Sequence, residues 1–89
     1  MTSKRKKPDT DLGTMILRNM AVVMEREREK RQLTKIEMAR LCEITTPFYF
    51  AILKATANPS LQVITRISIN LKVPLQELMM GIKSNDGGI

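Results

Sequence analysis

Apolar residues between positions 9 and 31 recur at the spacing of an α-helix, which predicts a long first helix. These residues are Leu12, Ile16, Met20, Val23 and Met24, and their spacing would place them along one side. We expect the helix to begin near Asp9–Asp11, where Asp and Thr side chains can cap free backbone N–H groups. From Glu25 to Arg31 acids and bases alternate. This predicts a solvated helix end, with a Glu27–Arg31 pair at the favourable i,i+4 spacing.

Two short helices separated by a tight turn are predicted next. The segment Thr34-Lys35-Ile36-Glu37 forms a capping box, which starts the second helix at Thr34. Its inward side is expected to consist of Met38, Ala39, Leu41 and Cys42. The segment 42–45 is typical of a turn. Thr45 or Thr46 then caps a third helix, which carries Pro47 in its first turn and runs to Lys54.

Two more helices complete the predicted domain. After a loop at 55–59, Ser60 caps a fourth helix, whose inward stripe should be Leu61, Ile64, Ile67, Ser68 and Leu71. Pro74 opens a fifth helix at Leu75–Met80, which Gly81 ends. Five helices and no convincing strand predict an all-α domain over residues 9–81. Residues 1–8 should form a basic arm that is disordered when free, and residues 82–89 a flexible tail.

Length and charge narrow the class of protein. The chain has 89 residues and a formal net charge of +6, so it forms one domain at most. A basic excess of this kind favours a polyanion as partner. The alternative that charge alone leaves open is a merely soluble basic domain.

The residue types present give no support for catalysis or metal binding. The chain has no histidine and one cysteine, Cys42, so an internal disulfide is excluded and a Cys/His zinc site lacks ligands. No glycine-rich phosphate loop appears. We expect no enzyme, no metal and no cofactor, and we expect Cys42 to be a buried, inert thiol in a reducing cytoplasm. The most apolar stretch, 15–24, contains Arg18 and is too short to span a membrane. A signal peptide is rejected because no small-residue cleavage site follows.

The second and third predicted helices, with their tight turn, have the spacing of a helix-turn-helix unit. In such a unit the second helix places its N-terminal end in the major groove of DNA. An ordinary pair of packed helices is the alternative. The residues nevertheless carry a resemblance. Leu33-Thr34-Lys35-Ile36-Glu37-Met38-Ala39, Ile44-Thr45, Ile52, Asn58-Pro59-Ser60-Leu61 and the segment 71–78 resemble the phage repressor (Cro/CI, or XRE) helix-turn-helix family. The resemblance covers roughly residues 10–80 and implies a five-helix lambda-repressor-like fold.

The resemblance implies DNA-binding roles for particular positions. The base-reading candidates are Thr46, Pro47, Phe50 and Ala51. Thr45 and Lys35 match positions that hold the DNA backbone, and Lys54 and Asn58 are weaker backbone candidates. A basic arm in front of the domain implies phosphate or groove contact by Lys4, Arg5, Lys6 and Lys7. The alternative for this arm is a solubilising basic tail.

The chain departs from the family's pattern at several positions. Lys35 replaces a usual Gln, and Glu43 replaces a usual turn Gly, so the turn either differs or holds a non-glycine residue at positive φ. Leu53 replaces a Glu, so Arg28 should lose its ion-pair partner. The third helix is apolar at positions where relatives carry Gln, Asn, Ser or Arg. Tyr49, at a core position, should be partly buried, and Phe50 either touches thymine methyl groups or belongs to a protein-binding surface.

We therefore expect a sequence-specific double-stranded DNA-binding transcriptional regulator, a repressor, that acts as a homodimer with its third helix in the major groove. The alternative is a protein-interaction module (an antitoxin, antirepressor or co-regulator) that uses the apolar third helix to bind a protein partner. Surplus apolar surface predicts the dimer interface at Val63, Ile69, Met79, Met80 and Ile82. The alternative interface is the first helix, through Leu17 and Val22.

Overall fold

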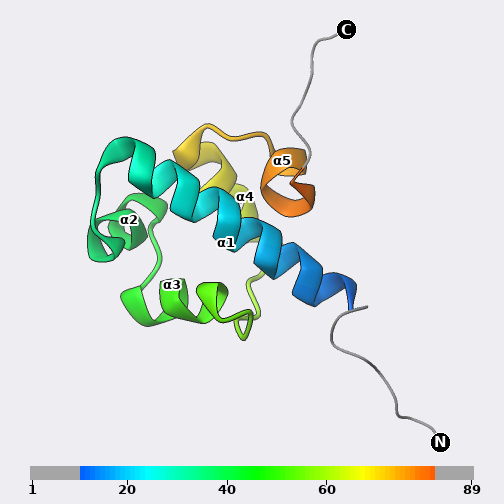
Figure 1. Ribbon diagram of the computed structural model, residues 1–89. Coiled ribbons are helices and arrows are strands. Elements are labelled where there is room, and N and C mark those ends of the chain that lie inside the picture. Colours follow the sequence, from blue (N-terminus) through cyan, green and yellow to red (C-terminus); the bar gives the residue numbers. More distant parts are fainter. Residues whose placement is uncertain (1–10, 82–89) are drawn as a thin grey trace, which may run out of the picture.

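The computed structural model describes residues 11–81, and this part of the chain folds into helices joined by short turns and loops (Figure 1). The helices are α1 (Leu12–Arg31), α2 (Lys35–Cys42), α3 (Thr46–Leu53), α4 (Leu61–Leu71) and α5 (Leu75–Met80). The predicted all-α fold with five helices is thereby confirmed over the described range. The predicted arm residues Lys4, Arg5, Lys6 and Lys7, and the predicted interface residue Ile82, lie outside the described residues.

Side-chain caps set where four of the helices begin. The capping residues are Asp11, Thr34, Thr45 and Ser60. The cap of α2 is reciprocal, because the Thr34 hydroxyl accepts from the Glu37 N–H at 3.1 Å and the Glu37 carboxylate accepts from the Thr34 N–H at 2.8 Å. Each cap satisfies N–H groups that have no partner inside the helix. Local chemistry therefore fixes these boundaries, as the sequence predicts.

The long helix α1 is the element around which the domain is assembled. It packs against α3 and α5, while α2 packs against α3 and α4, and α4 contacts α5 (Figure 1). Side chains from all five helices meet in one core, and the largest fully buried ones are Tyr49, Met20, Met24, Met38, Ile52, Ile67, Leu71, Leu78 and Cys42. Tyr49 is thus wholly buried rather than partly buried.

Several residues face differently from the prediction. Leu12, Leu41 and Leu61, expected to point inward, are exposed, whereas Leu17, expected as surplus surface, is buried. Apolar residues lie on so many sides of α1 that their spacing alone does not decide which row of side chains faces the core. The line that α3 and α5 cover passes through Leu17 and Met20 rather than Leu12.

The charged end of α1 is also not the solvated segment that the sequence predicts. The Glu27 residue is only 4% exposed, because the inward line of α1 continues onto it. Its carboxylate forms ion pairs with Arg26, Lys30 and Arg31, which include the expected Glu27–Arg31 pair. Arg26 also lies 2.9 Å from the Glu77 carboxylate of α5. This end of α1 is therefore a partly buried ionic link between two helices.

Candidate nucleic-acid interface

The turn between α2 and α3 is three residues long, from Glu43 to Thr45. Glu43 adopts a left-handed conformation at φ 61°, and its N–H donates to the Arg40 carbonyl at 3.0 Å. The next N–H, that of Ile44, donates to the Ala39 carbonyl at 3.0 Å, so the last turn of α2 is closed in the way that C-cap motifs close helices. Of the two outcomes expected for this turn, the structure shows a non-glycine residue at positive φ.

α3 has an inward face and an outward face. Tyr49 and Ile52 are fully buried, and they hold the helix to the core. On the opposite side lie positions spaced by three and four residues, which share one side of an α-helix. We call this side the outward face of α3; it consists of Pro47, Phe50, Ala51 and Lys54, with Thr46 at its edge. The structure therefore brings the four predicted base-reading residues and Lys54 together.

The outward face of α3 is mainly apolar. Phe50 is 38% exposed, and its ring meets the ring of buried Tyr49 edge-on, with centroids 6.4 Å apart. Edge-on contact is one of the arrangements that aromatic pairs favour. At the start of the helix, the exposed Thr45 hydroxyl accepts from the Phe48 N–H at 3.2 Å, so its oxygen serves as the cap while its O–H remains a donor.

A carboxylate of α1, Glu25, fixes α3 in place. It accepts hydrogen bonds from the Tyr49 hydroxyl at 2.5 Å, from Lys35 Nζ at 3.2 Å and from the Arg28 guanidinium at 2.9 and 3.2 Å. Burial raises the pKa of Glu25, but the bonds from Arg28, Tyr49 and Lys35 outweigh burial and lower that pKa from 4.5 to about 2. Burial and the Glu25 carboxylate both raise the pKa of the Tyr49 phenol. Glu25 thus joins α1 to α2 and α3 as an ionised group.

Glu25 was not among the residues that sequence reasoning selected. The signal was nevertheless present, because a tyrosine at a core position needs a polar partner for its hydroxyl. Arg28 lacks an ion-pair partner at position 53, as expected, but it is not left unpaired. Leu53 offers no carboxylate, and Arg28 instead pairs with Glu25 and donates to the Leu33 carbonyl at 2.8 Å.

The other candidates for DNA-backbone contact lie at the start of α2, at the end of α3 and in the loop after α3. Lys35 lies at the start of α2 with its Nζ on the Glu25 carboxylate, and about a third of its side chain is exposed, 34%. Lys54 is exposed at the C-cap of α3. Asn58 is exposed in the loop that follows α3.

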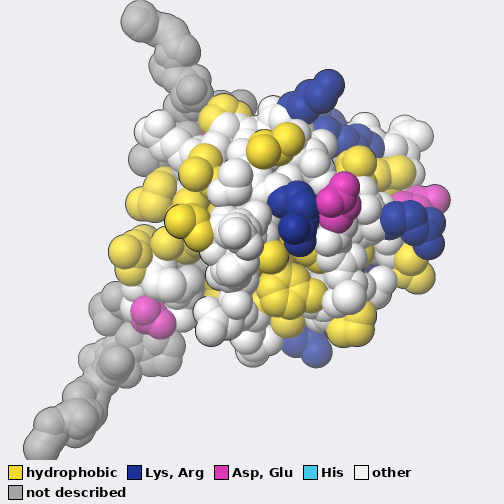
Figure 2. All heavy atoms as spheres, turned by 180° about the vertical axis from the view of Figure 1, so that it is seen from behind, with side chains coloured by type: hydrophobic (Ala, Val, Ile, Leu, Met, Phe, Trp, Pro, Cys, Tyr) yellow, Lys and Arg dark blue, Asp and Glu magenta, His cyan; other side chains and the backbone are white. Residues whose placement is uncertain are grey.

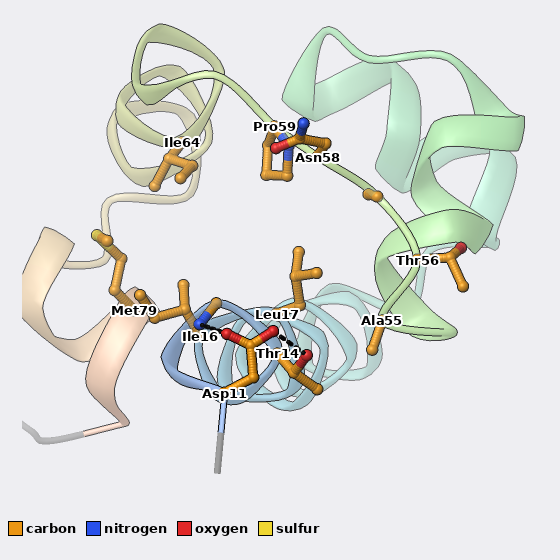
Figure 3. A pocket seen from close by; sticks show the side chains of 12 residues that line it. Asp11, Thr14, Ile16, Leu17, Ala55, Thr56, Asn58, Pro59, Ile64 and Met79 are labelled. Carbon is orange, nitrogen blue, oxygen red and sulfur yellow. Dashed lines mark hydrogen bonds between the residues drawn. The ribbon is translucent and has the colours of Figure 1, made fainter. Parts of the chain in front are cut away.

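A hollow of about 380 Å³ lies beneath that loop. Figure 3 shows Ile16 and Leu17 of α1 pointing toward it, with Asn58 and Pro59 of the loop on the opposite side. Asp11 lies at its edge, where its carboxylate accepts from the Thr14 hydroxyl at 3.1 Å. None of its lining residues belongs to the outward face of α3. The hollow is therefore separate from the outward face of α3, and it shares only Asn58 with the candidates for DNA-backbone contact.

The predicted dimer residues are exposed to different degrees. Ile69 is 67% exposed and Met80 is exposed, whereas Val63 and Met79 pack partly against the core. Val63 and Ile69 lie on different sides of α4, because residues six apart do not share a helix face. Figure 2 shows hydrophobic side chains gathered along the edge at the left of that view. Apolar surface is thus available, but not as one face that contains every predicted residue.

Residues 11–81 contain one buried thiol and no cluster of metal-ligating side chains. Cys42 is wholly buried, and burial raises the pKa of its thiol to about 11. In the same range, no three His, Cys, Asp or Glu side chains are grouped so that they could hold a metal ion. None of the helices described there has the length and apolar character needed to cross a bilayer.

A comparison with known families identifies the arrangement of α2, turn and α3. A family model described as helix-turn-helix matches residues 24–78, a range that extends from α1 into α5. No curated protein and no solved structure matches the chain significantly. The matched range includes the whole segment from Leu33 to Leu78 on which the sequence resemblance rests. The chain belongs to the helix-turn-helix family of the phage repressor type (Cro/CI, XRE), a family of DNA-binding transcription regulators.

Proposed function

We propose that the protein is a sequence-specific transcriptional repressor, without catalytic activity, that binds double-stranded DNA as a homodimer. The observation that carries this proposal is the outward face of α3. It lies directly after the helix-turn-helix turn, and the Tyr49–Glu25 hydrogen bond fixes the helix that bears it. A helix presented in this way enters the major groove with its N-terminal residues against base edges.

Backbone contacts supply most of the affinity in this proposal. Lys35 and Lys54 offer positive charge on either side of the turn and α3, and Thr45 offers a hydroxyl at the start of α3. The N–H groups at that helix start also favour phosphate oxygens. The basic residues 4–7 add four charges. Such contacts set the register of the protein on DNA, while contacts to bases select the sequence.

A homodimer would match the two-fold symmetry of paired half-sites in DNA. Two recognition helices related by two-fold symmetry read half-sites about one DNA turn apart. The exposed apolar side chains of Ile69 on α4 and Met80 on α5 support an interface formed by these two helices. Leu17, part of the alternative interface on α1, is buried and so offers no surface there.

The salt dependence of duplex binding tests the proposal. Each phosphate neutralised should contribute roughly −0.9 to the slope of log affinity against log salt concentration. We expect a steep slope that becomes shallower in Lys54→Gln and when residues 1–7 are deleted. Arg18→Gln is the matched control, because it removes one exposed charge from α1 outside the proposed interface. A slope near zero contradicts backbone binding.

A second function is favoured by one observation, the apolar character of the outward face. A protein-interaction module could use Pro47, Phe50 and Ala51 to bind a protein partner instead of DNA. The same titration separates the two functions. The interaction module predicts no measurable affinity for duplex DNA at any salt concentration, whereas the repressor predicts affinity that falls as salt rises.

A further inference from the structure

Apart from Lys54 at the C-cap, the outward face of α3 lacks the side chains that usually hydrogen-bond to base edges. In the major groove, Arg and Lys read guanine, Asn and Gln read adenine, and Asp and Glu accept from cytosine. No side chain of α3, Thr46–Leu53, carries an amide, carboxylate or guanidinium group. Its phenol, on Tyr49, is buried and donates to Glu25. Within the helix, only the Thr46 hydroxyl remains as a side-chain group that could hydrogen-bond to a base.

One apolar group in the major groove suits such a face. It is the C5 methyl group of thymine, which proteins read by apolar contact. Phe50 is exposed at the middle of the outward face, and its ring lies edge-on to the ring of buried Tyr49. Pro47 is exposed one turn earlier, and the small Ala51 side chain beside Phe50 leaves room for close approach.

We infer that α3 recognises thymine through its methyl group, with Phe50 and Pro47 as the contacting side chains. The inference rests on the proposed DNA-binding function and states which feature of the bases that function reads. The preferred half-site therefore contains thymine at the position that faces Phe50. Specificity arises from burying methyl groups rather than from polar pairing.

Duplexes that differ only in the thymine methyl test this inference. We would compare short alternating d(A-T) duplexes with alternating d(A-U) duplexes, which carry the same charge and the same Watson–Crick pairs. Burial of one methyl group corresponds to about a fourfold change in affinity. A dimer that contacts two methyl groups should bind d(A-T) about fifteenfold more tightly, with an unchanged salt slope. A second pair, alternating d(G-C) with and without 5-methylcytosine, should show tighter binding to the methylated duplex.

Variants assign the effect to α3. In Phe50→Ala the difference between d(A-T) and d(A-U) should shrink while the salt slope stays unchanged, and in Phe50→Leu part of the difference should remain. Leu61→Ala is the matched control, because Leu61 is 67% exposed on another helix, α4. It should leave the methyl preference unchanged. Helical circular dichroism shows whether each variant is folded.

The outcomes separate the inference from the proposed function. Equal affinity of the unmodified protein for d(A-T) and d(A-U), with a steep salt slope, overturns thymine-methyl recognition and leaves DNA binding standing. A methyl preference that persists in Phe50→Ala overturns the assignment to Phe50. No binding to any of the duplexes overturns the proposed function and the inference together, and it favours a protein partner for the apolar face.

Discussion

At the scale of single residues, Glu43 is held in a conformation that suits glycine. Its φ of 61° costs a residue with a Cβ about 1 kcal/mol. Its side chain offers little in return, because it is 66% exposed and its contact with Arg66 is 3.7 Å long, and such surface pairs contribute little. We therefore expect Glu43→Gly to raise the free energy of unfolding by about 0.5–1 kcal/mol, measured by urea denaturation.

The variant Glu43→Ala is the control for this prediction. It removes the contact between the carboxylate and Arg66 but keeps a Cβ at positive φ. Its free energy of unfolding should therefore lie within about 0.5 kcal/mol of that of the unmodified protein. If Glu43→Gly is no more stable than Glu43→Ala, backbone strain does not limit the stability of this turn.

At the scale of elements, the charged end of α1 makes stability depend on pH. Burial raises the pKa of Glu27, but hydrogen bonds from Arg31, Arg26 and Lys30 outweigh burial and lower it from 4.5 to about 2. Because the pKa is lower in the folded state, the stabilisation is fully present above the unfolded pKa. It is lost as pH falls from 4.5 toward 2. We expect the thermal midpoint to fall over this range.

The variant Glu27→Gln tests the source of this pH dependence. It should be about 1.5–3 kcal/mol less stable at neutral pH, because the buried carboxylate and its charge-assisted hydrogen bonds with the partly exposed Arg26, Lys30 and Arg31 are lost. Its stability should fall less steeply in acid. Glu29→Gln is the matched control. Its side chain is 73% exposed and lies 3.9 Å from Arg28, so neither stability nor pH dependence should change much. A steep acid transition that persists in Glu27→Gln would place its origin elsewhere, with Glu25 as the next group to test.

Sequence information sufficed for features that depend on neighbours along the chain. The caps at Thr34 and Ser60 bind N–H groups three residues away. The residues of the outward face of α3 were implied by the family resemblance instead. The burial of Leu17 and Glu27 depends instead on which helices cover α1. The Tyr49–Glu25 bond joins residues 24 positions apart. Contacts over such distances need the packing of the whole domain.

At the scale of the whole molecule, the proposed dimer has a direct test. Ile69→Glu and Met80→Glu place charges on exposed apolar positions of α4 and α5. We expect light scattering to give the unmodified protein twice its chain mass of 10.1 kDa and each variant the monomer mass, with helical content retained and DNA affinity reduced. Met79 is less suited to this test, because it packs partly against the core.

The variant Val22→Glu serves as the control for the interface. Val22 is equally exposed, at 68%, but lies on α1. It should remain dimeric if α4 and α5 form the interface. A monomer produced by Val22→Glu alone would move the interface to α1. If the unmodified protein is itself monomeric at micromolar concentration, the paired half-site mechanism loses its basis.

The buried thiol of Cys42 can report how often helix α2 separates from the core. It is the one cysteine of the chain, it lies at the end of α2, and the thiolate that reacts with labelling reagents is suppressed by a pKa of about 11. A reagent in solution can therefore reach it only during the intervals in which α2 separates from the core. The rate of labelling measures how often those intervals occur, without an introduced cysteine. A partner bound across α2 and α3 would lengthen the time between them.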